Sequence, residues 1–109
     1  MNRLLYAGIT LCLMAGLNVA APRPKANVYS GEISDSMCGL KHMMSGTAKD
    51  CTDKCVGGGS KYVLADVAHG KVYQLSNQEK PKQFSGEKVN VTGTLKDDTI
   101  EVQSIEAAK

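Results

Sequence analysis

The chain has 109 residues, with 13 basic and 11 acidic side chains and a formal net charge of +2 at pH 7. This length suits a single domain. The balanced charge excludes the basic tract typical of proteins that bind nucleic acid or anionic membranes, so we expect no nucleic-acid partner.

Residues 1–21 have the features of an export signal. Arg3 supplies a positive start, residues 4–17 are mainly apolar, and small residues precede Pro22. The apolar run is too short for a good transmembrane helix, so we expect it to be removed as a signal. After this removal we expect no stable insertion of the protein in a membrane. We expect a periplasmic or secreted mature protein, and the prolines at 22 and 24 predict an extended tether over residues 22–26.

Residues 27–106 have the alternation of a small β domain. Five stretches alternate in hydrophobicity, and we predict strands at residues 28–34, 61–67, 71–76, 87–95 and 99–105. Ala68-His69-Gly70 predicts a tight hairpin turn, and Asp97-Asp98 predicts another turn. Residues 77–85 are polar and predict a short helix or turn that plugs one end of the sheet, while residues 107–109 predict a frayed tail.

The last two predicted strands carry the clearest pattern. Alternation places Val89, Val91, Gly93 and Leu95 on one face of the first, and Ile100 and Val102 point inward from the second. We expect Gly93 at a bend of a barrel. Ile105 is one residue out of phase, which predicts a β-bulge or the end of the strand nearby.

The order of strands predicts the fold. Five short strands, with a small element between the third and the fourth, follow the order of an OB-like β-barrel, so the fold class is mainly β. The segments GEISDSMCG, CTDKCVGGGSKYVL, KVYQL and VNVTGTLKDDTIEVQSIE resemble a family of small exported bacterial proteins of uncharacterised function with an OB-like barrel. The resemblance spans about residues 29–105; it implies this fold and no reaction, substrate or partner.

A cysteine-rich insert separates the first two predicted strands. Thr47 and Asp50 resemble a capping box, with aspartate in place of the usual glutamate or glutamine, and predict a helix over residues 48–56. The glycines at 57–59 end that helix. Residues 36–44 predict a second helical turn, which Gly39 disfavours.

The insert contains a candidate metal site. Cys38 and His42 are four residues apart, as are Cys51 and Cys55, and residues at this spacing share one face of a helix. Three thiolates and one imidazole make a complete tetrahedral set for zinc. Cuprous ion is the alternative, since thiolates suit it and thioethers are close by at Met37, Met43 and Met44. The stronger interpretation of these methionines is that their flexible side chains fill gaps over an irregular core.

A disulfide competes with the metal, because an exported protein meets an oxidising compartment. Cys38 can bond to Cys51 or to Cys55 and leave one thiol over. Asp35 can cap the turn or orient His42, and the cap is the simpler interpretation. A nucleophilic pair of Cys38 and His42 leaves the other two cysteines without a role, so we predict no enzyme.

The sequence therefore predicts an exported, non-enzymatic domain that binds zinc or, as second choice, copper through Cys38, His42, Cys51 and Cys55. The alternative is a disulfide-stapled OB-like barrel that binds a protein or a glycan through its surface.

Export has a direct test in the mass of the protein purified from its native host. Cleavage of the export signal should remove about the first 20 to 26 residues of the chain, and the intact mass should show this loss. A native protein that still carries Met1 would contradict the export prediction.

Overall fold

The computed structural model describes residue 16, residues 25–42 and residues 45–109, so the expected export signal, most of the tether, Met43 and Met44 lie outside the described part. The elements in chain order are β1 (Asn27–Asp35), α1 (Ala48–Gly57), β2 (Tyr62–Asp66), the 3-10 helix η1 (Val67–His69), β3 (Lys71–Leu75), the 3-10 helix η2 (Pro81–Phe84), β4 (Lys88–Lys96) and β5 (Thr99–Ala107). The chain is mainly β, with its helix between the first two strands, as predicted. No helix in the described residues is long and apolar enough to cross a membrane.

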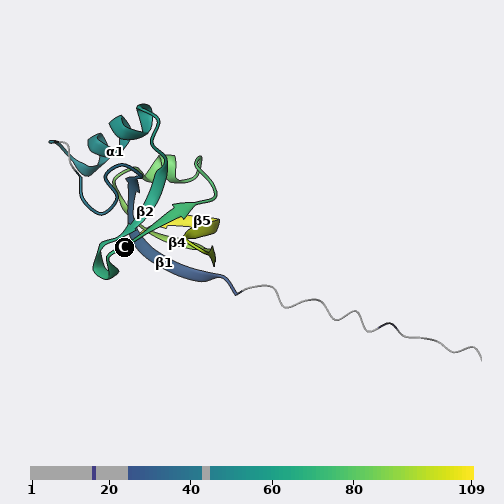
Figure 1. Ribbon diagram of the computed structural model, residues 1–109. Coiled ribbons are helices and arrows are strands. Elements are labelled where there is room, and N and C mark those ends of the chain that lie inside the picture. Colours follow the sequence, from purple (N-terminus) through teal and green to yellow (C-terminus); the bar gives the residue numbers. More distant parts are fainter. Residues whose placement is uncertain (1–15, 17–24, 43–44) are drawn as a thin grey trace, which may run out of the picture.

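The five strands close on themselves in the order β1-β2-β3-β5-β4, forming a small barrel (Figure 1). Four of the pairings are antiparallel, and β4 completes the ring by pairing with both β5 and β1. The parallel pairing of β3 with β5 is short and joins Gln74 to Thr99 and Leu75 to Ile100.

Alternating residues of the strands fill the interior of the barrel. The buried core consists of Ile33, Tyr62, Leu64, Leu75, Val89, Val91 and Ile100. The predicted inward positions at Val89, Val91 and Ile100 are confirmed, and each is fully buried. Leu95 was expected to face the core, but its side chain is 39% exposed. The pairing of β4 with β1 ends at Gly93, so no strand covers Leu95 from that side.

A β-bulge in β5 explains the phase of its apolar residues. Thr92 pairs with Ser104 but Gly93 pairs with Val102, which leaves Gln103 as an extra residue. The extra residue brings Ile105 back to the inner face, where it packs against the core. The predicted bulge is therefore confirmed. Gly93 lies at this point because a Cβ atom there would collide with the carbonyl oxygen of Glu101.

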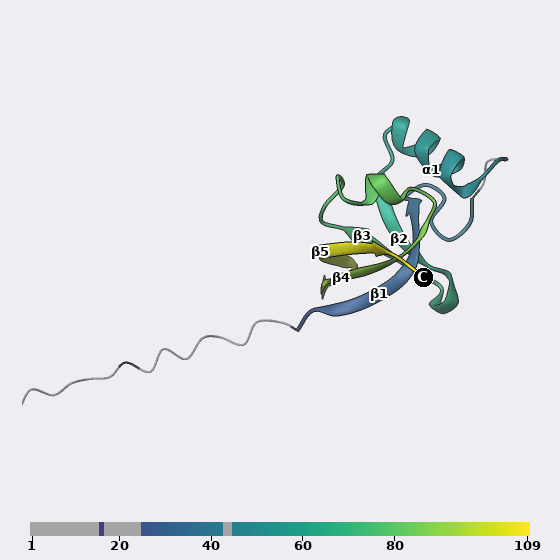
Figure 2. The ribbon, with the colours of Figure 1, turned by 180° about the vertical axis from the view of Figure 1, so that it is seen from behind.

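Two of the helices, α1 and η2, lie at one end of the barrel (Figure 1). Figures 1 and 2 show α1 and η2 at the same end and the turn between β2 and β3 at the other. Gly86, just after η2, has a φ of +74° and lies so close to the backbone of Lys49 in α1 that a Cβ atom would collide with it. The prediction that residues 77–85 plug one end of the sheet fits this arrangement.

Two predicted turns have different outcomes. The turn between β2 and β3 is η1 followed by Gly70 in the left-handed region, with a φ of 64°, so the expected glycine turn is confirmed. The second helical turn, expected over residues 36–44, is wrong in its described part: residues 36–40 form a non-helical turn. The reason is Gly39, whose φ of +57° departs from a right-handed helix.

The register of β4 can be tested by a matched pair of substitutions. Val91→Asp places a charge among buried apolar side chains and should lower the free energy of unfolding by about 4 kcal/mol or more. Asn90→Asp keeps an oxygen to accept the 2.7 Å hydrogen bond from Ser30 Oγ and should cost little. Urea denaturation measures both, and equal losses would show that the register is wrong.

Candidate metal centre

The turn that follows β1 is held by the carboxylate of Asp35. This side chain is fully buried, and its Oδ2 accepts hydrogen bonds from the backbone N–H groups of Met37 at 3.0 Å and Cys38 at 2.9 Å. The backbone N–H of Gly39 donates to the carbonyl oxygen of Asp35 at 2.8 Å. These bonds fix the direction of the chain at Cys38, so the sequence-based interpretation of Asp35 as a cap of the turn is confirmed.

The helix α1 supplies the other two cysteines. Thr47 caps its first turn, with Oγ1 accepting from the backbone N–H of Asp50 at 3.1 Å, as the capping pattern predicted. After its last turn, the backbone N–H of Ser60 donates to the carbonyl oxygen of Cys55 at 3.0 Å. Cys51 and Cys55 lie one turn apart on the buried face of this helix, with exposed fractions of 1% and 9%.

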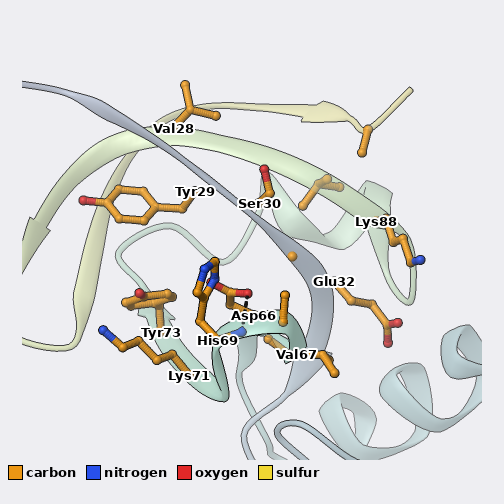
Figure 3. Close-up of a pocket in the computed structure, with 15 residues that line it drawn as sticks. Val28, Tyr29, Ser30, Glu32, Asp66, Val67, His69, Lys71, Tyr73 and Lys88 are labelled. Atoms are coloured by element: carbon orange, nitrogen blue, oxygen red, sulfur yellow. Dashed lines mark hydrogen bonds and ion pairs between the residues drawn. The ribbon is translucent and has the colours of Figure 1, made fainter.

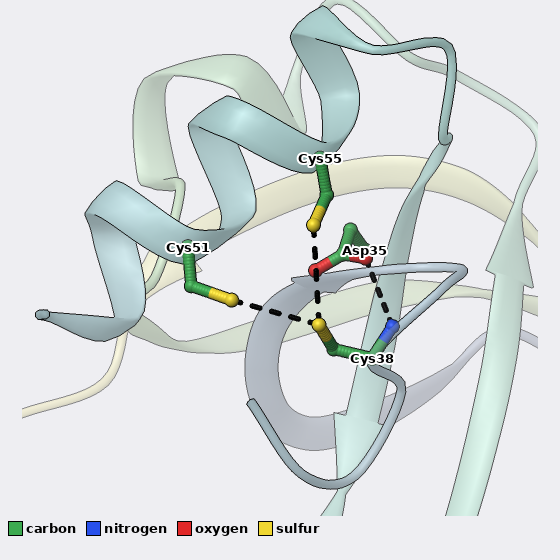
Figure 4. Close-up of side chains that lie close together, drawn as sticks. All are labelled: Asp35, Cys38, Cys51 and Cys55. Atoms are coloured by element: carbon green, nitrogen blue, oxygen red, sulfur yellow. Dashed lines mark hydrogen bonds between the residues drawn. The ribbon is translucent and has the colours of Figure 1, made fainter. Parts of the chain in front are cut away.

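The three sulfur atoms meet between the turn and the helix (Figure 4). Cys38 Sγ lies 3.5 Å from Cys51 Sγ and 3.9 Å from Cys55 Sγ. A disulfide needs about 2.05 Å between its sulfurs, so neither pair is bonded in this arrangement. Around a tetrahedral zinc ion with bonds of about 2.3 Å to sulfur, neighbouring ligands lie about 3.8 Å apart, close to both measured separations.

Asp35 is the fourth member of this group. One ligand atom from each of Asp35, Cys38, Cys51 and Cys55 lies within 4.8 Å of all the others. While Oδ2 holds the turn, Oδ1 is buried, receives no hydrogen bond from a nitrogen or oxygen donor, and points towards the sulfurs (Figure 4). The four side chains present the donor set of a tetrahedral metal site with three sulfurs and one oxygen.

The electrostatics of the site hold the Cys55 thiol in its protonated form. Burial, followed by the neighbouring Cys38 thiol and the charge of Asp35, raises the pKa of Cys55 to about 12. The thiol of Cys55 therefore keeps its proton at neutral pH unless a positive charge replaces it. A divalent cation held by Asp35, Cys38, Cys51 and Cys55 would supply that charge and displace the proton, as expected for thiolate metal sites.

His42 lies beside this group and outside it. Its Nε2 pairs with Glu32 Oε1 at 2.5 Å, and both side chains are 24% exposed. The hydrogen bond to Glu32 is the main cause that raises the pKa of His42 above its usual value, and the neighbouring Cys51 side chain adds to the effect. The structure thus brings together three of the four predicted ligands and places the fourth next to one of them.

Two residues acquire roles that the sequence pattern did not reveal. Asp35 faces the thiols with its second oxygen, although the pattern favoured a cap alone. Glu32 pairs with His42, and the sequence pattern gave Glu32 no role. The available signal was their spacing on β1: Glu32 and Asp35 are three residues apart at the end of the strand that leads into the insert.

A separate groove opens at the other end of the barrel. β1 pairs with β2 only from Glu32 onwards, so residues 27–31 pair with β4 alone and the wall opens beside them. A cavity of about 810 Å³ lies there, between the first half of β1 and η1 (Figure 3). The rings of Tyr29 and Tyr73 line it with their centroids 5.5 Å apart, and Asp66 Oδ2 pairs with His69 Nδ1 at 2.8 Å.

Residues 56–108 match a family model described as "Protein of unknown function (DUF5818)". The match begins one residue after Cys55 and covers the strands from β2 onwards, so it includes none of the four clustered side chains. No curated protein and no solved structure matches the chain.

The pairing of His42 with Glu32 predicts a pH dependence of stability. Because the folded pKa of His42 is raised above the value of about 6.5 for the unfolded chain, the pair stabilises the fold fully below that pH. The stabilisation is lost as pH rises through the folded pKa, and it amounts to no more than about 1 kcal/mol because solvent reaches both side chains.

Urea denaturation between about pH 5.5 and 8.5 measures this effect around the reference pKa of histidine. Glu32→Gln removes the charge that raises the pKa and should flatten the dependence. An equal slope in the variant and the unchanged protein would mean that another group titrates.

Proposed function

We propose that this chain is an exported, non-enzymatic domain of OB type that binds one metal ion through Asp35, Cys38, Cys51 and Cys55. The observation that carries the proposal is the convergence of these four ligand atoms within 4.8 Å of one another. The buried Asp35 Oδ1, which faces the sulfurs without a nitrogen or oxygen donor, supports it independently.

Zinc fits this donor set best. Three thiolates and a carboxylate oxygen suit zinc, which accepts sulfur and oxygen ligands in tetrahedral sites. Cuprous ion prefers soft sulfur ligands throughout, so a carboxylate at the fourth position disfavours it. The thioether of Met37, in the same turn, is 66% exposed. We therefore propose zinc as the ion, with copper as the second choice.

Two side chains compete for the fourth position. Asp35 already has an oxygen directed at the sulfurs (Figure 4), whereas His42 uses Nε2 for Glu32, and its side chain lies next to that of Cys51. We propose that Asp35 binds the ion and that His42 supports the site from outside, as residues next to metal ligands commonly do.

The fold supports a binding role. A five-stranded barrel with a Greek-key return of the last strands, in which β4 pairs back with β1, is the architecture of the OB type. Cys51 and Cys55 are nearly buried, so a substrate has little access to their sulfurs. We propose from the pattern of residues 1–21 that the domain works outside the cytoplasm, where an ion that stabilises a small core is valuable.

A second candidate function is recognition of a protein or glycan by a disulfide-stapled barrel. The groove lined by Tyr29 and Tyr73 favours it, because binding sites are commonly cavities of about 300–1,000 Å³ with aromatic walls and few polar groups. In this alternative the insert carries a bond between Cys38 and Cys51 in place of the ion. Metal-free protein whose stability depends on that bond would favour this function over the first.

Metal content is the direct test. The domain should be isolated with about one equivalent of zinc, measured by inductively coupled plasma mass spectrometry. A chelator should lower its melting temperature, because the free energy of binding at a structural site adds to that of folding. A metal-free domain, indifferent to chelator, would refute the proposal.

The fourth ligand can be identified by X-ray absorption at the zinc edge. We expect three sulfurs and one oxygen, without the outer-shell scattering that an imidazole ligand gives. Asp35→Asn should change this spectrum and weaken zinc binding about 10-fold or more. His42→Ala should leave the first shell unchanged.

His69→Ala is the matched control for the histidine, because His69 lies in η1 and its side chain is 74% exposed. Imidazole scattering that disappears in His42→Ala and persists in His69→Ala would move His42 into the site in place of Asp35.

A further inference from the structure

We propose that Cys38 and Cys51 form a redox couple within the metal centre: a peroxide joins them in a disulfide, and the metal is thereby released. This inference rests on the proposed function and adds its regulation. Cys38 Sγ lies 3.5 Å from Cys51 Sγ and 3.9 Å from Cys55 Sγ, so its sulfur is in contact with both of the others.

The positions of the three cysteines in the fold determine which two can form a disulfide. Cys51 and Cys55 are one turn apart on α1, and at this spacing the Cβ atoms of a helix lie about 5–6 Å apart. A disulfide needs about 3.5–4.5 Å between its Cβ atoms, so these two cannot bond without unwinding the helix. Cys38 comes from the turn after β1, and a small shift of that turn brings its sulfur to the nearer helix sulfur, that of Cys51.

Exposure selects the first sulfur to react. Cys38 is partly exposed, whereas Cys51 is 1% and Cys55 9% exposed. A peroxide therefore reaches Cys38 before it reaches either helix cysteine. Accessible thiolates next to a second cysteine are the usual place of such chemistry in proteins.

The reaction balances with hydrogen peroxide as the oxidant. The Cys38 thiolate attacks one peroxide oxygen, an S–O bond forms, the O–O bond breaks, and hydroxide leaves, so Cys38 becomes a sulfenic acid. The Cys51 thiolate then attacks that sulfur, an S–S bond forms, and the S–O bond breaks with loss of a second hydroxide, which is protonated to water. Two thiols and one peroxide thus give one disulfide and two waters.

Loss of the metal follows from the shared sulfurs. The disulfide removes two of the three thiolates from the donor set, and Asp35 with Cys55 alone is too small a set for a structural zinc site. Thiol reductant regenerates both ligands, so release is reversible.

The experiment uses zinc-loaded protein and stoichiometric hydrogen peroxide. Released zinc is followed with a chromophoric chelator, and the cross-link is located by peptide mapping after the remaining thiols are blocked. We expect one zinc released per peroxide consumed, a Cys38–Cys51 cross-link, and recovery of zinc binding after reduction. Zinc retained in the presence of peroxide, or zinc lost to sulfinic acid without a cross-link, would overturn the inference and leave the metal proposal standing.

A matched pair of variants tests the choice of partners without depending on bound zinc. Cys55→Ser and Cys38→Ser each remove one thiol of the group, but only Cys55→Ser keeps Cys38 beside Cys51. Peroxide should cross-link Cys55→Ser within one chain and should leave Cys38→Ser without such a bond. A Cys51–Cys55 bond formed equally fast in Cys38→Ser would overturn the inference. Protein that never binds zinc would overturn the proposed function, and the release step with it.

Discussion

Asp35 is a buried carboxylate, and its two oxygens have different surroundings. A buried charge is costly unless hydrogen bonds or an opposite charge compensate it. Oδ2 receives two backbone N–H groups, which fixes the turn, but Oδ1 faces sulfurs that donate weakly. A cation between Oδ1 and the thiols would satisfy the oxygen and displace thiol protons at the same time. The geometry of the turn and the proposed occupant of the site therefore depend on one side chain.

The barrel makes this local arrangement rigid. α1 follows β1 after the 12 residues 36–47, and two contacts fix the position of the helix on the barrel. The carbonyl oxygen of Cys55 accepts from Ser60 as the chain turns into β2, and Gly86 lies against the first turn of the helix where no side chain fits. Both helix cysteines are thereby held over the turn that carries Cys38. Two sulfurs held on a helix in this way would stay in place before an ion binds.

The sequence predicted those features that depend on local pattern. Strand alternation, the Thr47 cap and the displaced phase of Ile105 each follow from spacing along the chain, and the structure confirms them. The prediction that Leu95 faces the core was wrong because the exposure of this side chain depends on where β1 begins to pair with β4. The sequence of β4 alone does not reveal this. The partners of Asp35 and His42 could not be predicted from spacing either. Gly39 turns the chain out of a helix, so the four-residue spacing of Cys38 and His42 no longer aligns their side chains.

The proposed metal site and the proposed disulfide use the same sulfurs, and the structure shows why the sequence left both open. A separation of 3.5 Å between Cys38 and Cys51 is near the edge of a zinc tetrahedron, about 3.8 Å, and longer than a disulfide bond, about 2.05 Å. A movement of about 1.5 Å by the turn that carries Cys38 would take the two sulfurs from the first separation to the second. Burial keeps the Cys55 thiol protonated without a cation, so a metal would bind weakly at low pH and more strongly as pH rises. On the two proposals, the interpretations that compete on the sequence would be two states of one site, and the ion and the oxidant would decide between them.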